Sequence, residues 1–189
     1  YITTASGDKS TAFGGATLAS GETATAFGGD TTAEARLSTV FGKGHVAASY
    51  GETVIGLGAT NYAITTNGRT QFGPANATDR LFVIGNAIDS NGNDVVDSAE
   101  RSDAMVVLKN GRIGLGSSNP AEKLVVVGNI RNNVLAGVGN RLVASNGTGN
   151  LISMASGTNG QVMTQTAAGP VFQTLPSLGC TLDQAYDFG

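Results

Sequence analysis

The chain has 189 residues, a net charge of −3, only 13% charged residues and 28 glycines. It has no basic run and no basic residues interleaved with aromatic ones, and no stretch approaches the roughly 20 apolar residues of a membrane helix. We therefore expect neither nucleic acid nor, within this segment, a membrane as a partner. The single cysteine, Cys180, excludes an internal disulfide framework. We also expect the sequence to be part of a longer protein.

A repeat of 14 residues dominates the N-terminal part of the chain. Such a unit is too short for a helical hairpin and too rich in glycine and threonine for a helix, so it predicts one coil of a β-solenoid. Like side chains would then stack about 4.8 Å apart along the axis. The aligned columns are Thr11, Thr25, Thr39 and Thr53; Ala12, Ala26, Val40 and Val54; Phe13, Phe27, Phe41 and Ile55; and Gly14, Gly28, Gly42 and Gly56.

The two apolar columns of the repeat point to opposite faces of a strand. Alternation in "TAFG" sends Ala12 to one face and Phe13 to the other. A coil this small cannot enclose both columns, so we expect one of the two faces to meet another chain. The glycine column predicts corners with positive φ or a close backbone approach.

The units "STAFGGATLASGETATAFG" and "TVIGLGA" resemble the head repeats of trimeric autotransporter adhesins of the YadA type, over residues 5–60. The resemblance implies a left-handed parallel β-roll in which three chains pack around a common axis. After "TVIG" (53–56) the next match is "TQFG" (70–73). We interpret the intervening residues as an insertion and predict a β-roll domain over residues 1–73.

The stretch 79–128, from "DRLFVIGN" through "SDAMVVLKNGRIGLGSSNPAEKLVVVGN", resembles a module of phage tail fibres and bacterial surface fibres. We predict a β-rich neck or fibre module over residues 74–128. "MVVLKNGRIGLG" predicts a hairpin, with Asn110-Gly111 suited to a two-residue type I′ turn. "KLVVVGNI" predicts the next strand. Residues 129–189 contain "RLVAS", "NLISM", "QVMTQ" and "PVFQTL" between turn signals, which predicts a meander of hairpins. The end, "CTLDQAYDFG", resembles sequence that leads into a further β-rich region of such fibres. The predicted fold is all-β throughout.

The stretch "DSNGNDVVDSAE" (89–100) is the best candidate for a metal site. It places oxygen-bearing side chains at positions 1, 3, 5, 9 and 12 of a loop of the EF-hand kind, which suits a hard cation such as Ca²⁺. The sixth position is Asp94, where the sharp turn of such a loop normally has glycine, and we expect no flanking helices. A solvated acidic turn is the alternative. The candidate ligands are Asp89, Asn91, Asn93, Asp97 and Glu100.

The remaining residues do not suggest catalysis. His45 is the only histidine, so one chain cannot assemble a histidine metal cluster or a Ser-His-Asp triad. The acidic residues of the repeat are scattered over turns and do not form a repeated pair of carboxylates. We expect the exposed turns to be the places where a receptor could be recognised: Asp8, Lys9, Glu22, Asp30, Glu34, Arg36, Lys43 and His45.

The sequence thus predicts a non-enzymatic segment of an elongated homotrimeric fibre. It would project from a cell surface, phage tail or injection apparatus and attach to a surface receptor or glycan, with no resident cofactor apart from the possible Ca²⁺. A pure spacer is the first alternative. An ice-binding solenoid is a second, because a threonine ladder could order water, although the ladder is one threonine wide. A tailspike that degrades glycans is the third, if a cleft between chains brought two carboxylates together.

Overall fold

The structure, a computed structural model, describes residues 2–131, 143–145, 150–153, 157–158, 161–166 and 169–174. Two compact units divide the chain, residues 1–130 and 131–189. The predicted boundary after residue 73 lies inside the first unit. The boundary predicted after residue 128 lies close to the division between the units.

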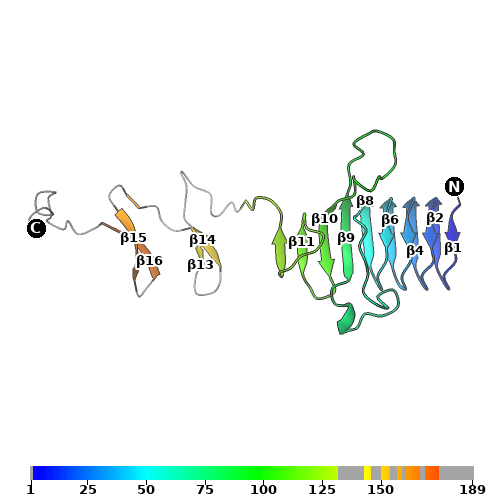
Figure 1. Cartoon of the computed structure of the whole chain (residues 1–189), viewed down its shortest axis with the longest axis horizontal. Helices are drawn as coiled ribbons and strands as arrows, with labels where there is room; N and C mark the ends of the chain where they lie inside the picture. Colours follow the sequence, from blue (N-terminus) through cyan, green and yellow to red (C-terminus); the bar gives the residue numbers. More distant parts are fainter. Residues whose placement is uncertain are drawn as a thin grey trace, which may run out of the picture. The chain divides into compact units, whose positions relative to one another are not determined.

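The N-terminal unit is a β-solenoid, which confirms the predicted fold class (Figure 1). Each coil contributes a short and a longer strand, and strands of each kind pair in parallel with one another in a separate sheet. The short strands are β1 (Thr4–Ala5), β3 (Leu18–Ala19), β5 (Thr32–Ala33) and β7 (Val46–Ala47). The longer ones are β2 (Thr11–Gly15), β4 (Thr25–Gly29), β6 (Thr39–Lys43) and β8 (Thr53–Leu57). Neighbouring strands pair in the 14-residue register that the repeat predicts, for example Phe13 with Phe27.

The core of the solenoid lies between its two sheets and consists of small side chains. The Ala/Val column points inward, and Ala26, Val40 and Val54 are at most 1% exposed. The facing sheet contributes Ala19 and Ala33, which are fully buried. Small residues fit because the two sheets of one narrow coil lie too close for larger ones.

The glycine column closes the coils tightly, as predicted. Gly28 has φ of 131°, a region that L side chains rarely adopt. A Cβ added to Gly28 would lie 1.8 Å from the carbonyl oxygen of Gly42 in the next coil. Gly14 and Gly42 have the same conformation and the same close approach. Both the backbone conformation and the available space therefore require glycine here.

The fifth rung of the longer sheet is not "TQFG", so that prediction was wrong. Strand β9 (Arg80–Asn86) pairs with β8 and places Val83 beside Val54. In "TQFG" the corresponding inward residue would be Gln71, whose amide would need partners inside an apolar core. Instead, the N–H groups of Thr70 and Gln71 both donate to the carbonyl of Asn67 in a turn. Residues 58–79 form an insertion that includes the 3-10 turn η1 (Pro74–Asn76).

Three further strands extend the same sheet. They are β10 (Asp103–Leu108), β11 (Ile113–Leu115) and β12 (Leu124–Val126). The predicted hairpin between β10 and β11 and the predicted strand β12 are confirmed. The predicted type I′ turn is wrong, because Gly111 is the one residue of the turn with positive φ. Its N–H donates to the Leu108 carbonyl, so the connection is a type I turn followed by a left-handed glycine.

Two long connections lie at opposite ends of the strands. The loop 87–102 stands at the edge where β8 and β9 end, and η1 lies at the edge where β9 begins (Figure 1). Val96 fastens the loop to the coils, because it lies against the backbones of Gly44 and Gly58. Arg101 adds hydrogen bonds from Nη1 to the carbonyls of Gly44 (2.6 Å) and Ala59 (2.9 Å).

The C-terminal unit contains two antiparallel hairpins in its described part. Strands β13 (Val143–Ser145) and β14 (Leu151–Ser153) form the first, and β15 (Gln161–Thr166) and β16 (Gly169–Thr174) form the second. They confirm the hairpins predicted from the short apolar pieces. The stretch 180–189 lies outside the described residues, as does Cys180. Among the described residues, no helix is long and apolar enough to cross a membrane.

Candidate functional site

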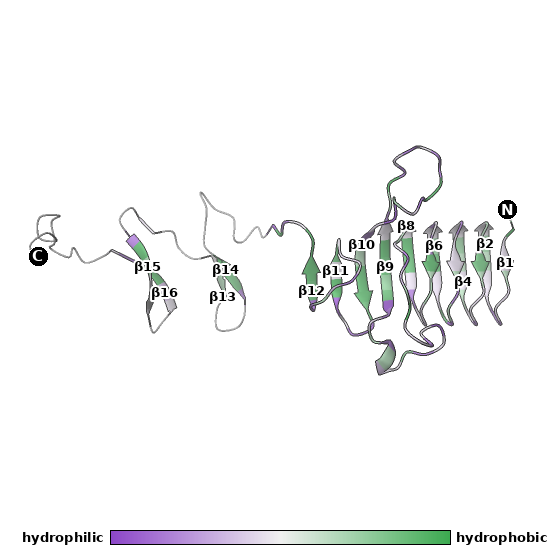
Figure 2. Ribbon diagram, in the orientation of Figure 1, coloured by the Kyte–Doolittle hydropathy of each residue, from purple (hydrophilic) through white to green (hydrophobic). Residues whose placement is uncertain are grey.

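The outer face of the eight-stranded sheet carries an unbroken apolar row, which we call the outer stripe. Strand register places its members side by side across all eight strands, from β2 to β12. Figure 2 shows apolar segments along these strands. The outer stripe consists of Phe13, Phe27, Phe41, Ile55, Ile84, Met105, Leu115 and Val126.

The phenylalanines of the outer stripe stack on one another and remain open to solvent in a single chain. The ring centroids of Phe13 and Phe27 are 5.1 Å apart, and those of Phe27 and Phe41 are 4.8 Å apart with an interplanar angle of 1°. Phe13 is 64% exposed and Phe41 55%. A contiguous exposed apolar face of this kind is characteristic of an interaction surface.

A second row runs beside the outer stripe and changes character along the sheet. It starts as the threonine ladder Thr11, Thr25, Thr39 and Thr53 and continues as Phe82, Val107, Ile113 and Leu124. The face is therefore half hydroxyl and half apolar over the regular coils. It is apolar in both rows over the later strands.

The structure separates the two predicted ladders. Ala26, Val40 and Val54 are buried inside their own chain, and Ala12 is partly buried at the first rung, so this column is not available to another chain. The Phe/Ile column is the one that is exposed. Each coil thus buries the Ala/Val ladder within its own chain and leaves the Phe/Ile ladder exposed to solvent.

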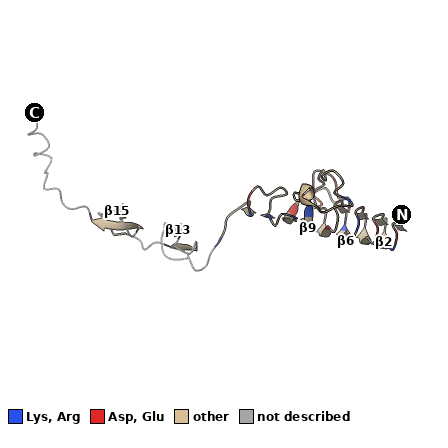
Figure 3. Ribbon diagram, turned by 90° about the horizontal axis from the view of Figure 1, so that it is seen from below, with Lys and Arg blue, Asp and Glu red and all other residues tan. Residues whose placement is uncertain are grey.

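Most of the turn residues proposed for receptor recognition form ion pairs with neighbouring charged side chains. Several form exposed ion pairs: Lys9 with Asp8 at 3.3 Å, and Arg36 with Glu22 at 3.2 Å. Arg69 pairs with Glu34, and Lys43 with Asp94. Figure 3 shows the charged residues as short segments separated by uncharged ribbon.

His45 is not an exposed turn residue, so that prediction was wrong. It is 0% exposed, and its Nδ1 accepts a hydrogen bond from the Ala59 N–H at 3.0 Å. Burial lowers the pKa of His45 and so favours the neutral ring. The repeat could have indicated the burial of His45, because Thr17 and Thr31 occupy the same column and are also buried.

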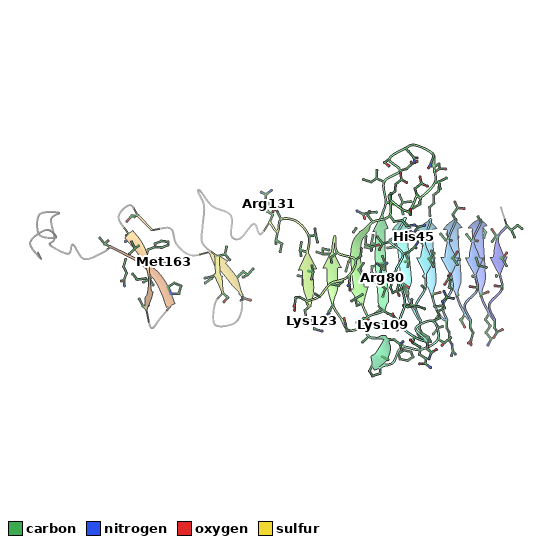
Figure 4. All side chains as sticks on the ribbon, in the orientation of Figure 1. His45, Arg80, Lys109, Lys123, Arg131 and Met163 are labelled. Atoms are coloured by element: carbon green, nitrogen blue, oxygen red, sulfur yellow. The ribbon has the colours of Figure 1, made fainter. Side chains whose placement is uncertain are left out.

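A buried polar cluster, which the sequence did not suggest, lies where the insertion meets the sheet. Arg80 of β9 and Asp103 of β10 form a salt bridge of 3.1 Å, with their side chains 4% and 0% exposed. Arg80 also donates from Nη1 to the carbonyl of Thr60 (2.6 Å) and from Nη2 to its Oγ1 (2.7 Å). The guanidinium carbon lies 4.4 Å from the ring centroid of Tyr62. Figure 4 shows Arg80 on the sheet beside the insertion.

Glu52 occupies the interior at the last regular coil. Its Oε2 accepts hydrogen bonds from the N–H groups of Ala48 and Ser49, both at 2.9 Å, and from the Tyr62 hydroxyl at 3.3 Å. Its Oε1 is buried and has no partner among the described residues. Burial raises the pKa of Glu52 to about 7. Earlier coils have the small residues Ala24 and Ser38 at this position. The last regular coil therefore has a carboxyl group where the preceding coils have a small side chain.

Asp79 holds the far end of the insertion. Both of its oxygens bind Thr65, with the N–H at 2.8 Å and the hydroxyl at 2.7 Å. Asn76 donates to the Thr65 hydroxyl at 2.7 Å. Open hollows of about 450 and 480 Å³ flank the segment 61–63 of the insertion. The polar groups of the cluster mostly bond to one another, which suits a structural support for the insertion.

The loop predicted to bind Ca²⁺ is folded on its own hydrogen bonds. Asp94 has φ of 55°, so it adopts the left-handed turn that glycine usually provides at this position. Asp89 Oδ1 accepts from the Gly92 N–H at 2.7 Å, and Glu100 Oε1 accepts from the Ser90 N–H at 2.7 Å. Hydrogen bonds lower the pKa of both carboxyl groups, chiefly from the Asp94 N–H to Asp89 and from the Ser90 hydroxyl to Glu100.

The other candidate ligands of this loop contact one another. The side-chain amides of Asn91 and Asn93 donate to Asp97 at 2.9 and 3.2 Å. Within the described residues, no group of three or more histidine, cysteine, aspartate or glutamate side chains is placed to hold a metal. Calcium binding by this loop therefore remains a prediction.

No protein-family model, curated protein or solved structure matches the chain. The function is therefore argued from the surfaces of the molecule.

Proposed function

We propose that this chain is a non-enzymatic segment of an extracellular homotrimeric fibre, in which the outer stripe packs against the outer stripes of two further copies. The observation that carries the proposal is the length of the stripe. It crosses eight strands without a charged residue, and its phenylalanines are 40–64% exposed in one chain. Burying a fully exposed phenylalanine is worth about 1.5–3 kcal/mol, and each of these partly exposed rings would contribute roughly half of that to the assembly.

The geometry supports self-association more directly than any other partner. A second copy presents the same stripe with the same strand spacing, so the stacked rings of two copies can pack along the whole sheet. The number three comes from the resemblance of residues 5–60 to the head repeats of YadA-type adhesins. Three equivalent faces on one axis would raise avidity for a receptor or glycan on the target surface.

The ice-binding alternative has less support. The threonine ladder is bordered by the phenylalanines of the outer stripe, and it ends at Phe82 in the fifth rung. A spacer role differs from adhesion only in whether this segment itself binds a target. The stripe would serve either role.

Two substitutions test the stripe. Phe27→Asp places a carboxylate in its centre, so we expect a monomer in sedimentation equilibrium where the unmodified chain forms a trimer. Leu37→Asp is the matched control, because Leu37 is also exposed (44%) but lies at a turn outside the stripe. We expect the control to remain trimeric. Equal masses for all three proteins would refute this placement of the interface.

A further inference from the structure

An apolar hollow with a half-buried lysine lies at the edge of the sheet where β8 and β9 begin and β10 ends. Its volume is about 300 Å³. Figure 4 places Lys109 at this edge. Four parts of the first unit converge on it: the turn before β8, the insertion, β9 and the turn after β10. The lining residues are Tyr50, Gly51, Phe72, Leu81 and Lys109.

The apolar wall of the hollow is exposed to solvent. Phe72 is 67% exposed and Leu81 44%. The rings of Tyr50 and Phe72 have centroids 4.8 Å apart and are tilted by 33°, so together they form an angled aromatic surface. Phe72 comes from "TQFG", the segment that does not form a rung. Its ring is therefore available for a different contact.

Lys109 supplies the polar group of the hollow. Its Nζ is buried and has no hydrogen-bond partner among the described residues. Burial lowers the pKa of Lys109, which reflects the cost of an ammonium group removed from water. The flexible four-carbon stem of a lysine allows Nζ to turn toward an acceptor in the hollow.

The nearest acidic groups do not satisfy Lys109. Asp79 and Glu52 attract its charge, but neither forms a salt bridge with it in the described structure. Both oxygens of Asp79 bind Thr65. Oε2 of Glu52 binds two backbone N–H groups, and its raised pKa of about 7 shows how strongly its site disfavours a charge. Neither carboxylate therefore accepts a hydrogen bond from Nζ, so the lysine can bind an acceptor that enters the hollow.

We infer that this hollow binds an acidic sugar unit, with the carboxylate of the sugar on Lys109 Nζ and its C–H face on the rings of Tyr50 and Phe72. A pyranose ring with a carboxylate combines an apolar face, which suits the two rings, with an anionic group, which suits the lysine. A lysine can only donate, so the ligand must carry the acceptor. The inference rests on the proposed attachment function and names the class of target it would recognise.

The test uses the full chain and two probes, sodium glucuronate and glucose, in saturation-transfer NMR titrations. We expect saturable binding of glucuronate and at least tenfold weaker binding of glucose. Lys109→Met should lower the glucuronate affinity at least tenfold, because it keeps the stem and removes the charge. Phe72→Ala should also weaken binding, and its exposed position makes a folding defect unexpected.

Lys123→Met is the matched control. Lys123 is a second lysine beside the same turn, but its Nζ donates to the Asn110 carbonyl at 3.0 Å and does not line the hollow. The Lys123→Met variant should bind glucuronate with the same affinity as the unmodified chain. The inference is overturned if glucuronate does not bind, if glucose binds equally well, or if Lys109→Met and Phe72→Ala both bind as before. Sedimentation equilibrium of the same samples distinguishes failure of the sugar site from failure of the proposed trimer. A trimer that does not bind glucuronate refutes only the sugar site.

Discussion

The regular coils (residues 4–57) and the later strands β9–β12 share one sheet but are stabilised differently. The coils repeat the same small inward side chains and the same glycine corner, so each rung contacts a near copy of itself. The later strands keep the inward column, with Val83 and Val106 fully buried, but they depend on the buried pair Arg80 and Asp103. The repeat thus sets the register of the coils by periodicity, and where it ends, the buried Arg80–Asp103 pair adds a specific contact between β9 and β10.

The largest expected effect concerns the later strands. Asp103→Asn leaves the Arg80 guanidinium buried without its counter-charge, so we expect the free energy of unfolding to fall by about 3–5 kcal/mol. Thermal and urea unfolding would measure it. Asp8→Asn is the control, because the Asp8–Lys9 pair is exposed and should contribute about 0–1 kcal/mol. Similar losses in the two variants would contradict the structural role of the buried pair.

The coils should be most sensitive at the glycine corner. Gly28→Ala forces a Cβ against the Gly42 carbonyl and a side chain into φ of 131°, so we expect a loss of roughly 3 kcal/mol in urea unfolding. Gly15→Ala, in the neighbouring strand β2 of the same sheet, is the matched control, because a Cβ there meets nothing within 4 Å. A Gly28→Ala protein as stable as Gly15→Ala would show that the coils do not close as tightly as described.

Glu52, where the coils meet the insertion, should make stability depend on pH. Burial raises its folded pKa from 4.5 to about 7, so the folded state binds a proton that the unfolded state releases between these values. The resulting stabilisation is complete below about pH 4.5 and is lost as the pH rises through 7. The slope would be at most about 1.4 kcal/mol per pH unit. Glu52→Gln should flatten this part of a pH series of unfolding curves, and an unchanged slope would contradict the assignment.

The smallest expected effect is that of calcium on the loop between β9 and β10. If the loop binds Ca²⁺, a concentration ten times the dissociation constant stabilises the fold by about 1.4 kcal/mol. We expect the melting temperature to rise with Ca²⁺, to fall again with EDTA, and to become insensitive to both in Glu100→Gln. A melting temperature that does not respond to Ca²⁺ in the unmodified chain would rule the site out.

The sequence predicted the regular coils residue by residue because the repeat directly encodes their register. The prediction was wrong at "TQFG", because the similarity of this stretch to the repeat does not take into account that Gln71 would have to face the apolar core. Arg80 and Asp103 lie 23 positions apart on either side of a long loop, so only the folded sheet brings them together. His45 could have been assigned to the interior from its column, but its polar character suggested a surface turn.

The mass of the unmodified chain in sedimentation equilibrium tests the central claim most directly. The outer stripe predicts a stable assembly with three times the 19.0 kDa mass of one chain. A folded monomer would contradict the proposed fibre, because the stacked phenylalanines would then remain exposed to water.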